Sequence, residues 1–288
     1  MLNILIGAVI LLALFFIVVM AVDCNRFTIR EYHCRSGSLK KDMKFVLLTD
    51  LHSKSFGRNN QRLLQAIEHI RPDMILIAGD MYTAGLGQTT DVAEKLVCTL
   101  AARYPVYYGM GNHEYKTRAF PKEYGYVYED YAKKLGQAGV RLLINEKACL
   151  SEDAVDIFGL DLGREYYRKF HRTRMEKSYL SGVLGRPDET RFSVLIAHNP
   201  DYFEDYAAWG ADLVISGHVH GGLMRLPVLG GVISPAMRLF PKYDGGLFKE
   251  GKSIMILSRG LGTHTLPIRI FNPGELVVIQ VDCQNDPC

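Results

Sequence analysis

The segment 216–222, SGHVHGG, carries two histidines that are separated by one residue and flanked by glycines. It directly follows an apolar run, 211–215, that is typical of a buried strand. In an extended chain, residues i and i+2 point to the same side, so the imidazoles of His218 and His220 can face one site. Glycine allows another part of the backbone to approach closely. Taken alone, the segment is equally compatible with two partly exposed turn histidines.

Four further apolar runs end in the same way, in polar side chains at the point where a strand is expected to stop. These ends read Asp50-Leu51-His52, Gly79-Asp80, Gly111-Asn112-His113-Glu114 and His198-Asn199. Burying such groups without a partner is costly, so packing alone does not explain them. In open α/β sheets, ligand sites gather outside the carboxyl ends of the strands. The pattern therefore predicts one site built from five strand ends.

The residue types in this set indicate a pair of metal ions. The set is Asp50, His52, Asp80, Asn112, His113, His198, His218 and His220. Carboxylate, imidazole and amide oxygen together suit a divalent ion such as Mn, Fe or Zn. Eight groups exceed what one tetrahedral zinc uses. Two ions about 3.5–4 Å apart, bridged by one carboxylate, can share the oxygens of a phosphate and turn a water into a hydroxide nucleophile.

The ordered series D-x-H, G-D, G-N-H-E, H and G-H-x-H resembles the motif set of the calcineurin-like metallophosphoesterases. The resemblance implies a four-layer α/β/β/α sandwich and a metal-dependent phosphoesterase that uses two divalent ions (Mn, Fe or Zn, with Mn the best candidate in vitro). It also implies ligand roles: Asp50, His52 and His220 for the first ion, Asn112, His198 and His218 for the second, and Asp80 between them. His113 would be the catalytic residue that protonates the leaving oxygen or stabilises the transition-state charge.

Three segments after position 215 are similar to the bacterial membrane-anchored branch of that family. They read SGHVHGGLMRLPVLG, FPKYDGGLF and SRGLGTHTLPIRIFNPGEL, and they depart from the branch at Leu223, where glutamine is common. This branch includes phosphodiesterases and enzymes similar to UDP-2,3-diacylglucosamine pyrophosphatases. The resemblance implies a phosphodiesterase or pyrophosphatase with a lipid-linked or membrane-proximal substrate. Two alternatives remain: a general phosphomonoesterase or nucleotide phosphodiesterase merely located at the membrane, and a non-catalytic metal-binding scaffold.

The elements that must position these residues alternate along the first half of the chain. Strand-like runs at 44–50, 73–80, 105–112, 191–199 and 211–218 end at the motifs, and helical periodicity falls at 58–70, 91–103 and 123–138. A charged stretch at 165–184 is also expected to be helical. Late strand-like runs at 253–260 and 275–282 follow without intervening helices. This order predicts a sheet-rich α/β domain covered by helices on both faces.

An uncharged apolar stretch at 4–22 is long enough to cross a bilayer as a helix. It lacks the basic start of a secretory signal peptide, which favours an uncleaved anchor. We therefore expect an anchor at 1–23, a linker at 24–43 and a metallophosphoesterase domain at 44–288. The nearby basic residues all follow the stretch, so the positive-inside rule favours a cytoplasmic domain, with an extracytoplasmic one left open.

The remaining observations limit the partners. A formal charge of +3 and the lack of a dense basic stretch give no reason to expect a nucleic-acid partner. The segment 223–242 is apolar but punctuated by Arg225, Arg238 and Lys242. It is either a flap packed on the core or a membrane-facing lip with its cations at headgroup depth. Glu114 either orients His113 or is a surface carboxylate, and His264 is expected to be a loop histidine.

Overall fold

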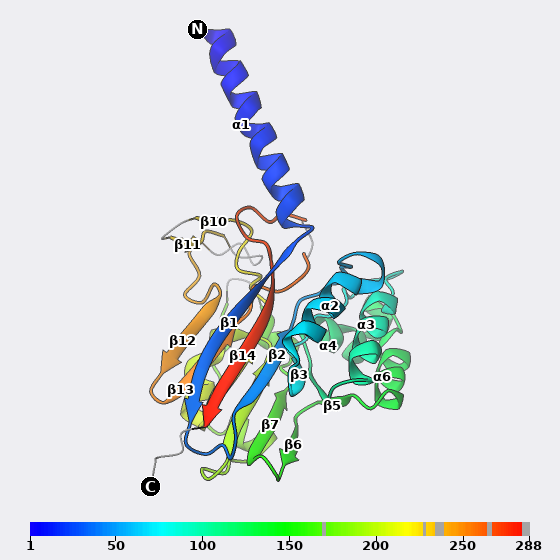
Figure 1. Ribbon diagram of the computed structural model, residues 1–288, viewed down its shortest axis with the longest axis vertical. Coiled ribbons are helices and arrows are strands. Elements are labelled where there is room, and N and C mark those ends of the chain that lie inside the picture. Colours follow the sequence, from blue (N-terminus) through cyan, green and yellow to red (C-terminus); the bar gives the residue numbers. More distant parts are fainter. Residues whose placement is uncertain (169–170, 227–228, 234–238, 264–266, 284–288) are drawn as a thin grey trace.

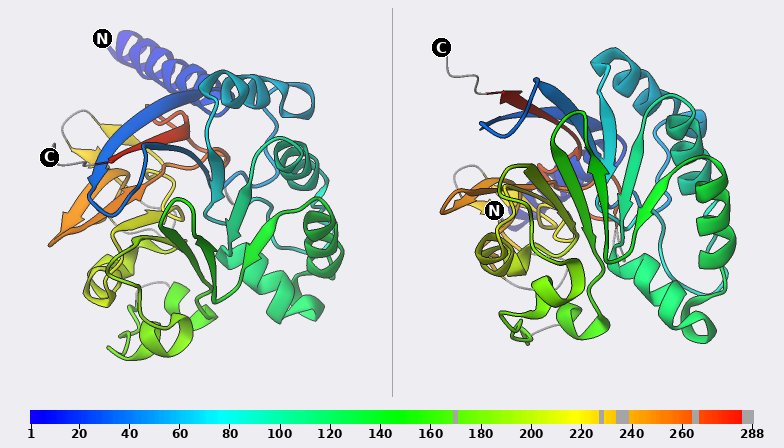
Figure 2. Two further views of the ribbon diagram at one scale, coloured as in Figure 1. Left: turned by 60° about the horizontal axis from the view of Figure 1, so that its bottom comes forward. Right: turned by 90° about the horizontal axis from the view of Figure 1, so that it is seen from below.

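The computed structural model describes residues 1–168, 171–226, 229–233, 239–263 and 267–283. Two six-stranded sheets lie face to face, with helices on the outer side of each (Figures 1 and 2). The first sheet has the order β1-β14-β2-β3-β4-β5, with bounds β1 Phe27–Ser36, β2 Met43–Leu48, β3 Met74–Ile77, β4 Val106–Gly109, β5 Arg141–Leu143 and β14 Gly274–Cys283.

The second sheet has the order β12-β13-β9-β8-β7-β6. Its bounds are β6 Glu146–Leu150, β7 Val155–Leu160, β8 Phe192–Ala197, β9 Leu213–Ser216, β12 Gly246–Glu250 and β13 Ser253–Leu257. A separate pair consists of β10 Arg225–Leu226 and β11 Gly230–Gly231. The α-helices are α1 Leu2–Asp23, α2 Gln61–Ile70, α3 Asp91–Ala101, α4 Asn112–Ala119, α5 Pro121–Tyr124, α6 Tyr128–Gln137, α7 Tyr179–Leu184 and α8 Phe203–Trp209. Short 3-10 turns are η1 Arg58–Asn60, η2 Arg164–Tyr167 and η3 Pro200–Tyr202.

The two sheets are held together by a core that both of them line. Strands β2, β3, β8 and β9 are apolar on both faces, as expected for strands covered on both sides. Leu47 and Leu76 of the first sheet pack in one cluster with Ile196 and Ile215 of the second. Separate clusters join α2, α3 and α6 to the first sheet and α7 and α8 to the second. The predicted α/β/β/α sandwich is confirmed.

Two segments differ from the expectation. The stretch 24–43, expected to be a linker, contains β1, which pairs in parallel with β14 along ten residues and forms an edge of the first sheet. Charged residues occupy the exposed face of β1, so its sequence lacks the apolar run by which a strand is recognised. The helix expected at 165–184 is also wrong: η2 and α7 are short, and the described residues between them are not helical. The segment 165–184 has many charged residues but no apolar residues at helical spacing, so a long helix there would have no face to pack against the core.

The apolar helix α1 projects from the domain, which it meets near its C-terminal end (Figure 1), and none of its most apolar 18-residue window is buried. Its length and composition suffice to cross a membrane. The topology fixes where it leaves the domain. β1 begins shortly after α1 ends and is parallel to β14, whereas β2 is antiparallel to β14. The base of α1 therefore lies at the edge where β2, β3 and β4 have their carboxyl ends.

Candidate metal centre

The sheet edge at the carboxyl ends of the strands gathers the predicted side chains. Asp50 and His52 follow β2, Asp80 follows β3, and Asn112 and His113 begin α4 after β4. From the second sheet, His198 directly follows β8, while His218 and His220 follow β9. His218 is half-buried and the other seven are buried. Residues far apart in the chain thus meet because parallel strands end at one edge.

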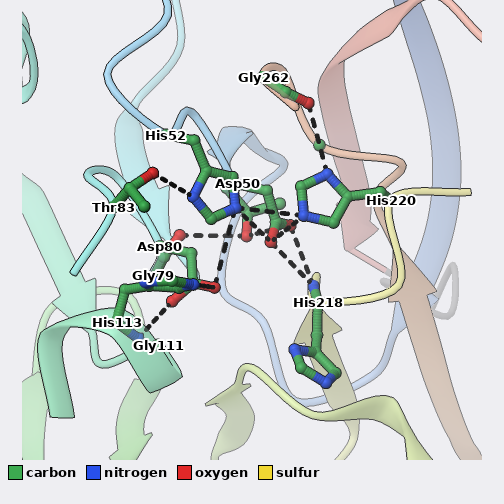
Figure 3. A network of polar contacts seen from close by, with 12 residues as sticks. Asp50, His52, Gly79, Asp80, Thr83, Gly111, His113, His218, His220 and Gly262 are labelled. Atoms are coloured by element: carbon green, nitrogen blue, oxygen red, sulfur yellow. Dashed lines mark hydrogen bonds and ion pairs between the residues drawn. The ribbon is translucent and has the colours of Figure 1, made fainter. Parts of the chain in front are cut away.

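The side chains form three overlapping groups, in each of which the ligand atoms lie within 4.8 Å of one another. These groups are Asp50, His52 and His220; His52, Asp80 and His113; and Asp80, His198 and His218. In the first group, His220 Nε2 lies 3.4 Å from Asp50 Oδ1 and 3.2 Å from His52 Nε2 (Figure 3). In the third, His198 Nε2 lies 3.1 Å from Asp80 Oδ2. Asp80 takes part in two groups, which is the position of a shared ligand.

The backbone at these positions is strained. Asp50, His52, Asp80, His218 and His220 all have positive φ values, between 46° and 74°. A left-handed conformation costs a residue with a side chain roughly 1–2 kcal/mol, and such strain persists only where the surrounding structure imposes it. Here it turns each side chain toward the centre immediately after its strand ends.

The glycines that precede the ligands permit the loops to touch. A Cβ on Gly79 would lie 2.2 Å from the Gly111 nitrogen, and a Cβ on Gly217 would lie 2.3 Å from Asp50 Oδ2. Real Cβ atoms do not approach backbone nitrogen or carboxylate oxygen so closely. Gly79 therefore lets two loops of the first sheet touch, and Gly217 lets a loop of the second sheet touch the Asp50 loop of the first.

Hydrogen bonds orient the histidines in two different ways. The Nδ1 atoms of His198 and His220 face carbonyl oxygens, of Ala78 at 2.5 Å and of Gly262 at 3.3 Å. His52 Nδ1 lies 3.2 Å from the Thr83 hydroxyl. Each Nδ1 thus has a group that can accept its proton, which leaves the Nε2 lone pair for a metal ion. His113 is reversed, because its Nδ1 accepts the Ala84 N–H at 2.8 Å and its proton belongs on Nε2.

Two buried acceptors in the site lack hydrogen-bond partners. Asn112 Oδ1 and His198 Nε2 are both inaccessible to water and form no hydrogen bond of acceptable geometry among the described residues. Leaving a buried acceptor without a hydrogen bond costs about 1–3 kcal/mol of stability. Amide oxygen and imidazole nitrogen are both ligands for a borderline divalent ion. The residues present therefore fit the expected ions.

The charges of the cluster are arranged around the shared carboxylate. Burial raises the pKa of Asp50 to about 6. Burial also acts to raise the pKa of Asp80, but His198, 3.1 Å away, opposes it, and that pKa lies well below its usual range. Burial acts to lower the pKa of His198, yet Asp80 and Asp50 raise it to about 9. Imidazole charge thus compensates the carboxylates, which is the role that cations play in a metal site.

Glu114 is the first residue whose importance the sequence left open. It is fully buried, and its carboxylate accepts hydrogen bonds from Asp80 N at 2.8 Å, Met81 N at 2.9 Å, Gly111 N at 3.1 Å and the Tyr108 hydroxyl at 2.7 Å. The surface-carboxylate interpretation is wrong, and Glu114 fixes the Asp80 turn rather than His113. Its spacing of three residues from Gly111, typical of a helix capping box, was the available signal.

Arg269 and Asn272 were missed altogether. Arg269 is 2% exposed and donates to the carbonyl oxygens of Arg259, Gly260, Gly262 and Asn272. Asn272 is fully buried, and its Nδ2 donates to the carbonyl oxygens of His220 at 2.8 Å and Gly222 at 2.7 Å. An isolated arginine in an apolar stretch was the only sequence signal.

The SGHVHGG segment differs from the extended chain assumed for it. β9 ends at Ser216, and the positive φ of both histidines makes the segment a turn. His220 joins Asp50 and His52, whereas the ring of His218 points away from them (Figure 3) and joins Asp80 and His198. Val219, between them, is buried in the cluster under α7 and α8.

The apolar segment 223–242 contains residues that are bonded within the protein and residues that are exposed. Arg225 is a structural residue, since it donates to the Gly221 and Asp244 carbonyls and pairs with the Asp244 carboxylate at 3.1 Å. For Arg225 these contacts favour the alternative of a flap packed on the core. Lys242 pairs with Glu204. Leu229, Leu239 and Phe240 are 61%, 66% and 58% exposed. Arg238 and His264 lie outside the described residues.

A two-sheet sandwich with an Asp/His/Asn cluster at its strand ends defines a class, the metal-dependent phosphoesterases. Residues 43–222 match the family described as Calcineurin-like phosphoesterase, and the chain belongs to this family. The resemblance seen in the motifs is thus confirmed at the level of the family, as is the predicted metal-dependent phosphoesterase class.

The chain is 28% identical over 254 residues to an uncharacterized metallophosphoesterase of Campylobacter jejuni, which covers 85% of this chain and 60% of that relative. It is 26% identical over 250 residues to a transmembrane protein with metallophosphoesterase domain of Danio rerio, covering 82% and 52%. A solved 5'-nucleotidase precursor from Thermus thermophilus is similar at a TM-score of 0.45 and 15% identity, covering 76% and 49%. The chain spans less than two thirds of each of these proteins.

Proposed function

We propose that this chain is a two-ion hydrolase of phosphoric esters that α1 anchors in a membrane. One observation carries the metal part of the proposal: the buried Asn112 Oδ1 has no hydrogen-bond partner among the described residues, in a site where His198 Nε2 lies 3.1 Å from the shared Asp80. The proposed division is an anchor at 1–23 and a catalytic domain from about residue 44, to which β1 adds an edge strand.

The ligand roles follow the grouping of the Asp and His side chains, and Asn112 is added because its buried Oδ1 has no hydrogen-bond partner among the described residues. Asp50, His52 and His220 would hold one ion, His198, His218 and Asn112 the other, and Asp80 both. Two such ions supply charge neutralisation for the phosphate oxygens and acidify the attacking water. In the hydrolysis, the water oxygen forms the new bond to phosphorus and the bond from phosphorus to the leaving oxygen breaks.

For His113 we propose hydrogen-bond donation rather than proton transfer. Its Nδ1 accepts the Ala84 N–H, so the ring is held neutral with its proton on Nε2. A neutral donor stabilises charge on a phosphate or leaving oxygen but has no second proton to give. His113→Ala should then slow esters of good and poor leaving groups by similar factors. A much smaller effect on p-nitrophenyl than on alkyl esters would instead indicate general acid catalysis.

For the substrate we propose a phosphodiester or diphosphate that is lipid-linked or held near the membrane. The site lies at the sheet edge where α1 leaves the domain, so a substrate in the bilayer surface is within reach. The transmembrane name of the zebrafish relative and the apolar, exposed α1 support the anchor. We place the domain on the cytoplasmic side on the flanking charges alone.

A hydrolysis panel on the full chain in detergent with Mn²⁺ tests the proposal. It compares monoesters, diesters, nucleoside diphosphate sugars and lipid-linked diphosphates by kcat/KM. We expect diesters or diphosphates to exceed monoesters, and acylated substrates to exceed their deacylated forms. Equal kcat/KM with and without acyl chains would rule out the lipid-linked substrate and favour a phosphoesterase merely located at the membrane.

A matched pair of variants tests the metal site in the same preparation. Asp80→Asn should lower metal affinity and turnover by more than about 100-fold. This exceeds the 10- to 100-fold loss that is typical when only a group supporting a ligand is changed. Asp156→Asn is the control, since Asp156 is an equally buried carboxylate that pairs with Lys147 and Arg191 away from the site. Wild-type metal content in Asp80→Asn would overturn the ligand assignment, and tight metal binding without any turnover would support a scaffold.

A further inference from the structure

We propose that the domain itself enters the bilayer surface, through a lipid-contact surface made of Phe271, Leu229, Leu239 and Phe240. The inference rests on the proposed anchoring of α1. It goes further because it states that the catalytic domain does not hang from a flexible tether. The turn before β14 would be immersed, and the metal centre would open directly at the headgroup layer.

Phe271 contacts the anchor well above its base. Its ring centroid lies 6.3 Å from the centroids of both Phe15 and Phe16. Phe16 precedes the end of α1 at Asp23 by seven residues, which is about 10 Å of helix at 1.5 Å per residue. The headgroup layer on one side of a bilayer is only about 5–7 Å thick. A membrane that contains α1 therefore contains the Phe271 ring at the boundary of the acyl chains.

The backbone of Phe271 indicates that this position is imposed. Its φ is 55°, a left-handed value that is a genuine outlier for a bulky residue. The residue is nevertheless 43% exposed, so a large part of its surface is left uncovered by the protein. A strained residue that directs an aromatic ring outward, against an apolar helix, is explained if the ring is buried in lipid rather than in the domain.

The other members of the surface lie in the adjoining lobe. Ile270 bridges to Met224 next to β10, and the Arg225 N–H donates to the Ile270 carbonyl at 3.0 Å. Phe240 joins the same lobe through its N–H, which donates to the Val232 carbonyl at 2.9 Å. Figure 1 shows β10 and β11 beside the base of α1. Large apolar side chains exposed on the lobe that borders an apolar helix fit the acyl boundary of a lipid surface.

Fluorescence quenching by lipids with brominated acyl chains tests this placement on the full chain in vesicles of phosphatidylcholine and phosphatidylglycerol. The chain has one tryptophan, Trp209, at the end of α8 away from the metal centre. It serves as the internal control, which bromolipids should not quench. The double variant Phe271→Trp, Trp209→Phe should show strong quenching. An indole at 271 that water-soluble quenchers reach and bromolipids do not would overturn the proposal, as would a shielded indole that neither reaches.

Activity separates this proposal from the proposed function. Phe271→Asn removes the ring while keeping a residue type that tolerates positive φ, and Phe271→Leu keeps an apolar side chain. Phe271→Asn should lower kcat/KM for a lipid-linked substrate about tenfold and leave a soluble diester unchanged, with Leu restoring most of the loss. Equal rates for all three chains on the lipid-linked substrate would overturn it. Absence of hydrolysis in the unmodified chain would count against the proposed function instead.

A second inference rests on hydrogen bonds alone: the geometry points to Asn272 and Asp23 as positioning residues for His220. Three consecutive residues from His220 to Gly222 have φ values of 52°, 70° and 85°. The Asn272 side chain clamps this turn through the carbonyls of His220 and Gly222. The Asn272 N–H in turn donates at 2.9 Å to the Asp23 carboxylate, the last residue of α1, which is 2% exposed. The end of the anchor is thus bonded to a loop that carries a metal ligand.

Mn²⁺ titration of the full chain, followed by electron paramagnetic resonance, tests the clamp. Asn272→Ala should weaken one of two Mn²⁺ ions by about 10- to 100-fold and leave the other nearly unchanged, as expected for a group that orients one ligand. Asp23→Asn, which leaves Asn272 in place, should have a smaller effect on the same ion. Ser253→Ala is the control, because that buried hydroxyl donates to a backbone carbonyl at the start of β13, away from the site. Two unaltered affinities in both variants would refute the clamp.

Discussion

The candidate metal centre is supported from two sides by buried charged side chains of opposite sign, Glu114 and Arg269. On the first-sheet side, the Glu114 carboxylate collects N–H donors around Asp80 and Gly111. On the α1 side, the Arg269 guanidinium collects carbonyl acceptors, including Gly262, whose oxygen also meets His220 Nδ1. Burial shifts the pKa of both groups toward the neutral form, raising that of Glu114 to about 7 and lowering that of Arg269 to about 10.

The difference follows from which backbone groups each loop leaves unpaired. A turn that exposes N–H groups needs an anion, and one that exposes carbonyls needs a cation with several donors. Burying either charged side chain costs free energy. The cost is tolerated because nearly every lone pair of Glu114 and nearly every N–H of Arg269 forms a hydrogen bond. The first two predictions below test whether Glu114 and Arg269 each support one side of the site only, and the other two test single side chains elsewhere in the comparison.

The largest expected effect comes from Arg269→Met. Removal of the guanidinium leaves the carbonyls of Arg259, Gly260 and Gly262 without their donor, so the free energy of unfolding should fall by about 3–5 kcal/mol, measured by urea denaturation. Arg191→Met is the matched control, since Arg191 also donates to two carbonyls but lies outside the site. Only the Arg269 variant should weaken the ion near His220. An equal loss of affinity for both metal ions in Arg269→Met would mean that Arg269 and Glu114 do not support separate sides of the site.

Glu114→Gln should cost slightly less, on the order of 3 kcal/mol. Hydrogen bonds to charged groups contribute about 1.5–3 kcal/mol each, and glutamine keeps one acceptor while its NH₂ faces backbone N–H groups. The metal loss should fall on the ion held by Asp80 and His198, read from the same Mn²⁺ titration. A loss confined to the ion near His220 would contradict the comparison.

A pH dependence of roughly 2–3 kcal/mol should arise from Asp161, which links α4 to the second sheet through Arg118. Burial raises the pKa of Asp161 to about 6, from 3.8. The folded state then holds this proton more tightly than the unfolded chain does. The contribution is fully present below about pH 4 and is lost as pH rises through 6. Urea denaturation across that window should show the decline, and Asp161→Asn should reduce it by this amount, leaving the part that comes from Asp50 and Glu114. Unchanged pH dependence in the variant would assign the slope to another group.

The smallest effect is expected from Thr83→Val, which removes the hydroxyl beside His52 Nδ1. The free energy of unfolding should drop by about 1 kcal/mol, the typical worth of one hydrogen bond. Affinity for the ion shared by Asp50 and His220 should fall severalfold, while Thr83→Ser should restore it. No change in either quantity would show that His52 is oriented by its packing alone.

Much of the site could be predicted because it rests on local pattern. A buried strand followed by Asp, His or Asn is recognisable without knowing what it faces, and every such strand end reaches the centre. The errors fall where local pattern is weak. The charged residues on the exposed side of β1 make its sequence resemble a linker, and 165–184 carries the charges of a helix without an apolar period. Arg269 and Asn272 act through backbone groups distant in sequence, which no motif records, whereas Glu114 carries only the spacing of a helix capping box.

The sequence by itself determined the chemistry: which side chains can bind ions, that they follow strands, and that an apolar helix precedes them. Tertiary structure decided the geometry. Sheet packing placed Asp80 in two of the three side-chain groups. Single hydrogen bonds to Ala78, Gly262 and Ala84 separated two histidines that present Nε2 lone pairs from one that presents a proton. The fold also brought the end of α1 to the edge of the site. Residue type fixes what a group can do, but proton position and direction depend on neighbours that only the fold supplies.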